Sequence, residues 1–179
     1  MRRDLWLIGF ALSMCPVTAV AGQEDHIPRG LDRATQVVAQ DAFSTHVSVA
    51  AGVRIIHAWT RATDGDAALV FMDIENGSDG EVRLLGGAAE IATAVQLAAH
   101  DFRNPGDRVD LEALPISEGQ MFPLTPETVF LELRALSGPL TRGDGFEMHV
   151  ILDPIGEVAI HVEVEASDAS NHSHAGHAH

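Results

Sequence analysis

The sequence predicts an all-β protein, an antiparallel sandwich or barrel of about seven to nine short strands. Short runs rich in Val, Ile, Leu and Phe recur along residues 46–166, and Gly, Pro, Asn and Asp separate them at nearly regular spacing. In several runs apolar residues alternate with polar ones, which is the period of a half-buried strand. Pro115, Pro123 and Pro126 exclude a long helix from their part of the chain.

The first half of this region is expected to form four strands separated by turn residues. Their positions are residues 46–59, 67–76, 81–85 and part of 88–102. Asn76-Gly77 begins a turn of the kind that joins hairpin strands, and Gly86-Gly87 interrupts the third strand. The fourth segment also has the composition of a helix. Strands on both sides of it favour a strand, because consecutive elements usually pair.

The second half is expected to form further short strands, of which the last two are the clearest. These strands lie within residues 108–116, 120–124, 128–136, 146–152 and 158–165. In the third of them, the odd-numbered residues from Val129 to Leu133 are apolar and alternate with Phe130 and Glu132. This alternation predicts a strand with one buried and one solvated face.

The first 21 residues have the order of a secretory signal peptide. Two arginines precede an apolar run from Leu5 to Met14, and a small-x-small sequence ends at Ala21. The run is too short to cross a bilayer of ~30 Å, and Met14 is too bulky for the position before a lipid-modified Cys15. We therefore expect export to the periplasm and no membrane insertion of the mature chain. The expected organisation is a signal peptide (1–21), a flexible lead-in (22–45), one β-domain (46–166) and a flexible tail (167–179).

The composition excludes several classes of function. The chain has a formal net charge of −15 and contains no lysine, which disfavours nucleic acid and anionic lipid as partners. Its single cysteine lies in the leader, so thiolate catalysis and thiolate metal sites are excluded from the mature protein. The sequence shows no serine-hydrolase elbow, zinc-protease helix or phosphate-binding glycine loop. We expect a binding protein and not an enzyme.

The C-terminal tail carries the most conspicuous cluster of candidate ligands. His172, His174, His177 and His179 lie within eight residues on a Ser, Ala and Gly backbone. Neutral imidazole binds Cu(II) and Zn(II) well, and a mobile segment can wrap around an ion. The alternatives are an affinity tag, which would be an unbroken run of histidines, and incidental low complexity.

A second candidate site follows from the last hairpin, whose loop is Asp153–Glu157. If this loop is symmetric about Ile155, His149 lies opposite His161, and Glu147 lies opposite Glu163. Two imidazoles in directly opposed positions, with Cβ atoms ~5 Å apart, can share a metal ion. The alternative is a solvated face without a ligand, and a shift of register would separate the pair.

Two further histidines are isolated in the sequence. His57 lies in an apolar segment beside Trp59, and we expect it to be a half-buried histidine with its hydrogen bonds satisfied. His100 lies near a strand end before Asp101, and two interpretations remain open, a metal ligand and a surface histidine.

The order of several segments resembles the periplasmic copper chaperones of the PCu(A)C family over residues 47–165. Ala58-Trp59-Thr60-Arg61 matches a strand ending in Ala-Trp-x-Arg, and Leu85-Gly86-Gly87-Ala88 matches a Leu-x-Gly-Ala step. An Ala-rich strand that runs to an Asn-Gly-type turn, residues 67–77, lies between them. Residues 114–152 match a later run of Ile-Pro, Leu-x-Pro, a Leu-rich strand, Pro-Leu-x-x-Gly-Asp and a closing hairpin.

The resemblance implies a cupredoxin-like β-sandwich that binds Cu(I) through a His or Met, a further Met and a His-x-Met pair. It also implies delivery of copper to an oxidase or another cuproprotein. Of these ligands, this chain has a candidate for the first alone, His100. The other positions align near Arg108 or Leu111 and near Phe130 and Glu132, none of which carries sulfur. Because soft thioether ligands select Cu(I), the sequence favours Cu(II) over Cu(I).

Together these observations predict a periplasmic metal-binding protein of copper-chaperone type. It captures copper, with zinc as the second ion that such ligands accept, and hands it to a cuproprotein or oxidase-assembly partner by ligand exchange. The alternative is a β-sandwich interaction module of the cell envelope that has lost its metal site. The candidate metal ligands are His172, His174, His177, His179, His149, His161 and His100.

Overall fold

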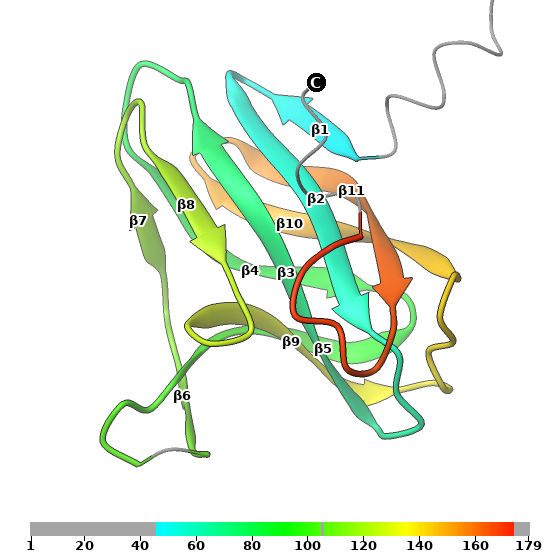
Figure 1. The fold of residues 1–179 in the computed structure, drawn as a ribbon. Helices are drawn as coiled ribbons and strands as arrows, with labels where there is room; N and C mark the ends of the chain where they lie inside the picture. The colour runs from blue at the N-terminus through cyan, green and yellow to red at the C-terminus, as the bar shows by residue number, and fades with distance from the viewer. Residues whose placement is uncertain (1–45, 105, 174–179) are drawn as a thin grey trace, which may run out of the picture. The chain divides into compact units, whose positions relative to one another are not determined.

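The computed structural model describes residues 46–104 and 106–173, and these residues form eleven strands (Figure 1). The strands are β1 (Val47–Ala50), β2 (Val53–Arg61), β3 (Ala67–Asn76), β4 (Val82–Ala89), β5 (Ala92–His100), β6 (Arg108–Asp110), β7 (Leu114–Ile116), β8 (Met121–Leu124), β9 (Val129–Leu136), β10 (Gly145–Asp153) and β11 (Gly156–Glu165). The prediction of an all-β protein is confirmed. In this part of the chain, no helix is long and apolar enough to span a membrane.

Seven strands close a hydrogen-bonded ring in the order β2, β11, β10, β4, β5, β9 and β3, and β3 pairs again with β2. Neighbours in the ring are antiparallel except β11 and β2, which run parallel with Glu163 beside Trp59. Strands β1, β6, β7 and β8 extend the ring at its edges. The expectation of a purely antiparallel arrangement is therefore wrong for one pair. The number of strands exceeds the expected range because two expected segments, 46–59 and 108–116, each contain two strands. Strands β6 and β7 of the second segment have three residues each and are too short to show a period.

Two expected strand boundaries also differ. Residues 46–59 were expected as one strand, but they split into β1 and β2 at Ala51-Gly52, where both residues have positive φ. Gly86-Gly87 does not interrupt its strand, because β4 continues through it to Ala89. The ambiguous segment 88–102 forms β5 and the end of β4, so its assignment as a strand is confirmed.

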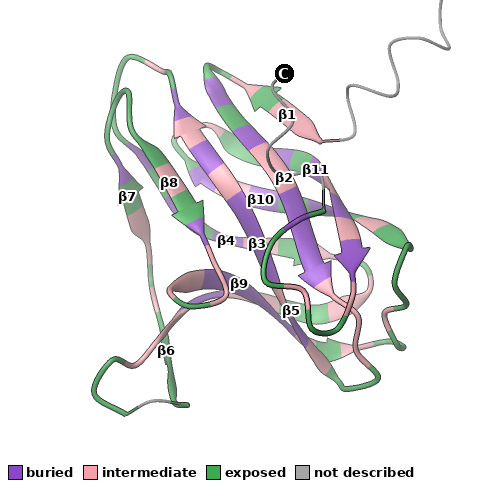
Figure 2. Cartoon of the chain, in the orientation of Figure 1, coloured by how far each residue is buried: buried purple, intermediate pink, exposed green. Residues whose placement is uncertain are grey.

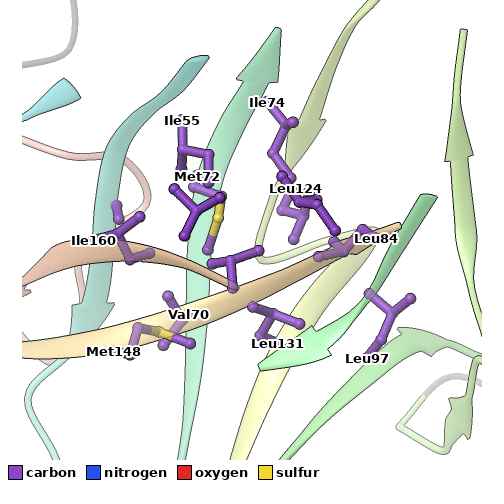
Figure 3. Close-up of a cluster of buried hydrophobic side chains, with 14 of the residues drawn as sticks. Ile55, Val70, Met72, Ile74, Leu84, Leu97, Leu124, Leu131, Met148 and Ile160 are labelled. Atoms are coloured by element: carbon purple, nitrogen blue, oxygen red, sulfur yellow. The ribbon is translucent and has the colours of Figure 1, made fainter. Parts of the chain in front are cut away.

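The main core lies inside the ring and is made of the inward faces of its strands (Figure 2). Figure 3 shows Val70, Met72, Leu84, Leu131 and Met148 packed together from β3, β4, β9 and β10. Each such side chain contributes roughly 1.5–3 kcal/mol when it is removed fully from water. The last hairpin follows the predicted alternation. Its inward set is Met148, Val150, Leu152, Val158, Ile160, Val162 and Val164, all of them buried.

Strand β9 is buried on both faces, which corrects the expected half-buried strand. Phe130 packs with Trp59, Phe71 and Ala98 in a second apolar cluster. Glu132, on the same face as Phe130, is 6% exposed. The sequence pattern was misleading here because a charged residue can be buried when guanidinium groups pair with it.

Candidate metal centre

Four side chains from distant parts of the chain meet beside the parallel β2–β11 pair. His46 lies directly before β1, His57 lies in β2, and Glu163 lies near the end of β11. His172 lies in the segment after β11. We call these four residues the histidine cluster.

A β-bulge brings His57 to this cluster. The pairing of β2 with β3 shifts register between Ile56 and Trp59, and His57 has a positive φ of 52°. A bulge adds a residue to one strand and redirects its side chains. The backbone N–H of His57 donates to the carbonyl of His46 at 2.8 Å, so the bulge also aligns these two residues.

The segment after β11, residues 166–173, folds back on the domain and is named here the C-terminal strap (drawn in red in Figure 1). Ala169 packs against the second apolar cluster, and its carbonyl accepts a hydrogen bond from Nε of Arg61 at 2.7 Å. The backbone N–H and hydroxyl of Ser173 donate to Oε1 of Glu165 at 2.8 and 2.6 Å. These contacts hold His172 in a position where it is 2% exposed.

The ligand atoms of the cluster lie close enough to share one ion. One donor atom from each of His46, Glu163 and His172 lies within 4.8 Å of the other two. The two oxygens of Glu163 lie 3.4 Å from Nδ1 of His46 and 3.6 Å from Nε2 of His172. The ring of His57 is centred 5.4 Å from that of His172 and 6.2 Å from that of His46.

Glu165 orients the buried ligand from its other side. Its Oε1 lies 2.8 Å from Nδ1 of His172, which turns Nε2 of the same ring toward Glu163. A carboxylate on the second ring nitrogen is the usual way in which a protein fixes the tautomer of a metal-binding histidine.

The buried surroundings set the protonation of these groups. Burial lowers the pKa of His172 below its ordinary value, although Glu163 and Glu165 oppose the shift. Burial raises the pKa of Glu165, but the hydrogen bonds from Ser173 and the charge of His172 outweigh it, so this pKa lies below its usual value. A neutral imidazole and ionised carboxylates are the forms that bind a metal ion.

A pocket of about 190 Å³ adjoins the cluster. His57, Trp59, Met72, Asp73 and His172 are among the residues that line it. Burial raises the pKa of Asp73, and the charge of His57 opposes the shift. The carboxylate of Asp73 and the thioether of Met72 therefore line the same pocket as the imidazoles of His57 and His172.

The donor set fits a borderline cation. Imidazole nitrogen and carboxylate oxygen suit Cu(II) and Zn(II), whereas Cu(I) prefers sulfur. His46, Glu163 and His172 each offer one such atom, and the three atoms lie within 4.8 Å of one another. The residues present can therefore hold a divalent ion of this class.

The predicted ligands of the tail are only partly within the structure. His172 is brought into the cluster, and it is buried where a flexible tail was expected. His174, His177 and His179 lie outside the described residues. The structure places the first histidine of the tail beside His46 and Glu163, which were not among the predicted ligands.

The predicted pairing of His149 with His161 is wrong. The turn between β10 and β11 is centred on Pro154, so Leu152 pairs with Gly156, whose φ is +101°. His149 therefore lies opposite Ala159, and His161 lies opposite Glu147. The shift preserves the faces of both strands but moves the partners by two residues.

His100 is placed away from the ligand-forming group. Its Nε2 lies 2.8 Å from the carbonyl of Pro126, and its ring meets the edge of Phe130 with centroids 5.0 Å apart. Among the described residues, the group of ligand atoms that could hold a metal ion does not include His100, His149 or His161.

The positions that align with the Cu(I) ligands of the resemblance carry an ion-pair network. Arg108 pairs with Glu132, and Arg134 lies 2.8 Å from Glu132 and 2.6 Å from Asp110. The guanidinium of Arg108 also stacks over Phe130, 5.8 Å from the ring centre. In the part of the chain that the structure describes, Arg108, Glu132, Arg134 and Asp110 thus form ion pairs with one another.

Sequence reasoning missed His46, His57 and Glu163 as one group. One signal was present for His57, because the buried residues of β2 change period from Val53 and Ile55 to Ala58 and Trp59. Such a change marks a bulge. For His46 and Glu163 there was no local signal, since their contact depends on which strands are neighbours.

Comparisons with known proteins support the same fold. Residues 53–164 match the model of the LpqE-like lipoprotein family. A search among curated proteins found no match. The apo PCuAC domain of PmoF2 is 26% identical, with a TM-score of 0.59, and the match covers 70% of this chain and 99% of that domain.

Two structures with copper are also similar. The copper-bound PCuAC domain from PmoF2 is 25% identical with a TM-score of 0.59, covering 68% of this chain and 98% of that one. The solution structure of CuI-DR1885 from Deinococcus radiodurans is 18% identical with a TM-score of 0.51, covering 75% and 87%, and it shows likeness of fold alone. The resemblance to PCuAC domains is therefore confirmed.

Proposed function

The chain belongs to the LpqE-like family, and we propose that it is an extracytoplasmic copper-binding protein of the PCuAC chaperone type. Likeness to PCuAC domains, one of them copper-bound, supports copper as the ion. The description of the family as lipoproteins supports a place outside the cytoplasm, and the signal-peptide order of residues 1–21 agrees with it. Copper is the cargo of such a protein, and no reaction step is needed.

One observation carries the proposal, the convergence of His46, Glu163 and His172 with His57 beside them. Imidazole and carboxylate ligands favour Cu(II), with Zn(II) as the competing ion. The group consists of two imidazoles and one carboxylate, and Met72 lines the pocket beside it.

The cluster also suits transfer by ligand exchange. The side chains of His46 and Glu163 are 20% and 29% exposed, whereas His172 is nearly fully buried. Ligands of a receiving cuproprotein therefore reach the ion from the side of His46 and Glu163. His172 retains the ion until the last step.

Titration of the purified protein with Cu(II) tests this function. We expect one tight Cu(II) per chain, with nitrogen hyperfine structure in the electron paramagnetic resonance spectrum. His46→Ala and His172→Ala should each weaken binding at least about tenfold, which is ~1.4 kcal/mol, because each removes one ligand. Parallel titrations with Zn(II) and Cu(I) measure selectivity.

Two controls separate the cluster from other histidines. His149→Ala removes an exposed imidazole of β10 that is not part of the histidine cluster, so it should leave the affinity unchanged. A triple variant, His174→Ala, His177→Ala and His179→Ala, should keep the tight site. If the triple variant loses tight binding while His46→Ala keeps it, the tail and not the cluster is the site. If the intact protein takes up no copper, the interaction-module alternative is favoured.

A further inference from the structure

We propose that His161 forms, with Glu163, an outer cation-binding station that receives divalent copper and passes it to the histidine cluster. This inference rests on the proposed function, since the cluster is the destination of the ion. It concerns a residue that lies outside the group formed by His46, Glu163 and His172.

The register of the last hairpin places both groups of the station on one outward face. Glu163 lies opposite Gly145, and His161 lies opposite Glu147. The inward neighbours Val162 and Ile160 are buried, so the intervening residues point away from the core. His161 and Glu163 are two residues apart on β11, so their side chains leave the same face of the sheet roughly 6.5–7 Å apart along the strand.

Gly145 allows His161 to lean toward Glu163. A Cβ atom on Gly145 would collide with Nε2 and Cε1 of His161. The imidazole therefore lies over the backbone of the residue that is the strand partner of Glu163. The missing side chain at position 145 leaves the space that the imidazole of His161 occupies, beside the strand position opposite Glu163.

The station opens to solvent through a hollow of about 320 Å³. His161, Glu163, Glu165 and Asp144 line this hollow together with Arg142. The hollow is lined by three carboxylates and one guanidinium, so its electrostatic potential is negative and attracts cations. Such a potential raises the rate at which a cation is captured.

Glu163 connects the station to the cluster. It lines the hollow with His161, and its two oxygens face His46 and His172. An ion held by His161 and Glu163 can therefore reach the cluster by exchanging His161 for the imidazoles of His46 and His172. Glu163 remains bound throughout, so the ion is never released.

Stopped-flow mixing with Cu(II) tests this route. Trp59 lines the pocket beside His57, so quenching of its fluorescence reports arrival at the cluster. His161→Ala removes the imidazole of the outer station, and we expect it to slow association roughly tenfold. Dissociation into a chelator should slow by the same factor and leave Kd unchanged, because a station on the route changes both rates equally. A merely structural role would change Kd or the unfolding midpoint.

Two further variants complete the test. Gly145→Ala displaces the imidazole while keeping it in the chain, and it should slow both rates as His161→Ala does. His149→Ala, the matched control on the same face, should change neither rate. Unchanged rates in His161→Ala, or equal slowing in His149→Ala, would overturn the inference and leave the proposed function intact. Failure of the parent protein to take up copper would overturn both.

Discussion

At the scale of single residues, burial and not position in the sequence determines what a histidine can do. His172 lies in a polar, histidine-rich segment, yet it is 2% exposed and touches two carboxylates. His149 lies in a regular strand but is exposed on the outer face of the hairpin. The candidate ligand is therefore the residue that the tail delivers into the domain.

The pH dependence of the metal-free protein is predicted by the environment of His172. Because burial holds its folded-state pKa below 6.5, the unfolded chain takes up the proton first as the pH falls. The stability that neutral His172 contributes is thus fully present above about pH 6.5 and is lost on acidification. We expect the difference in urea midpoint between the parent and His172→Gln to shrink between pH 7.5 and pH 5.5.

Nuclear magnetic resonance of the imidazole protons provides the direct check, with His172→Gln assigning the signal. A titration midpoint above the ordinary value would contradict the prediction.

At the scale of elements, the close approach of β4, β5 and β10 explains why position 87 is a glycine, although Gly86-Gly87 was expected to interrupt its strand. Gly87 of β4 lies between Val150 of β10 and Val95 of β5. A Cβ atom at this position would lie 2.6 Å from the carbonyl oxygen of His149 and 3.0 Å from Cε of Met148. The sequence showed only a possible interruption, because the reason for the glycine lies on a strand far away along the chain.

Gly87→Ala tests this close packing. The added methyl group meets backbone on β10, which cannot move as a side chain can, so we expect a loss of about 1–3 kcal/mol of unfolding free energy. Gly138→Ala is the matched control, since nothing lies within 4 Å of the position that its added methyl group would take. Denaturant unfolding measures both. Equal stability of the two variants would show that β10 yields to the methyl group.

The bulge in β2 and the C-terminal strap are the elements that build the site. The first turns His57 toward His46, and the second brings His172 from the end of the domain. Neither follows from strand periodicity. A bulge is a departure from the period, and the strap is held by side-chain contacts to Arg61 and Glu165.

At the scale of the whole molecule, the closed ring depends on its apolar core, because the described residues contain no cysteine. Leu131 belongs to this core, where Figure 3 draws it among the buried side chains, and it is fully buried. Leu131→Ala should lower the unfolding free energy by about 2–5 kcal/mol through lost burial and a residual cavity. Val49→Ala, at a side chain that is 65% exposed, should change it by less than about 0.5 kcal/mol.

Urea unfolding followed by circular dichroism measures the pair. A cost below that of the exposed control would mean that this part of the core collapses around the missing side chain.

The class of fold, most of the strands and the inward faces of β10 and β11 could be predicted from the amino-acid sequence, because apolar alternation is a local property of a strand. The sequence also predicted His172 as a metal ligand, and this stays a prediction. Which histidines meet depends instead on the tertiary structure. The contact between His46 and Glu163 requires the parallel pairing of β11 with β2, and the partner of His161 depends on a turn centred on Pro154. These arrangements arise from ring closure and register, which join residues far apart in the chain, and no local pattern of side chains encodes them.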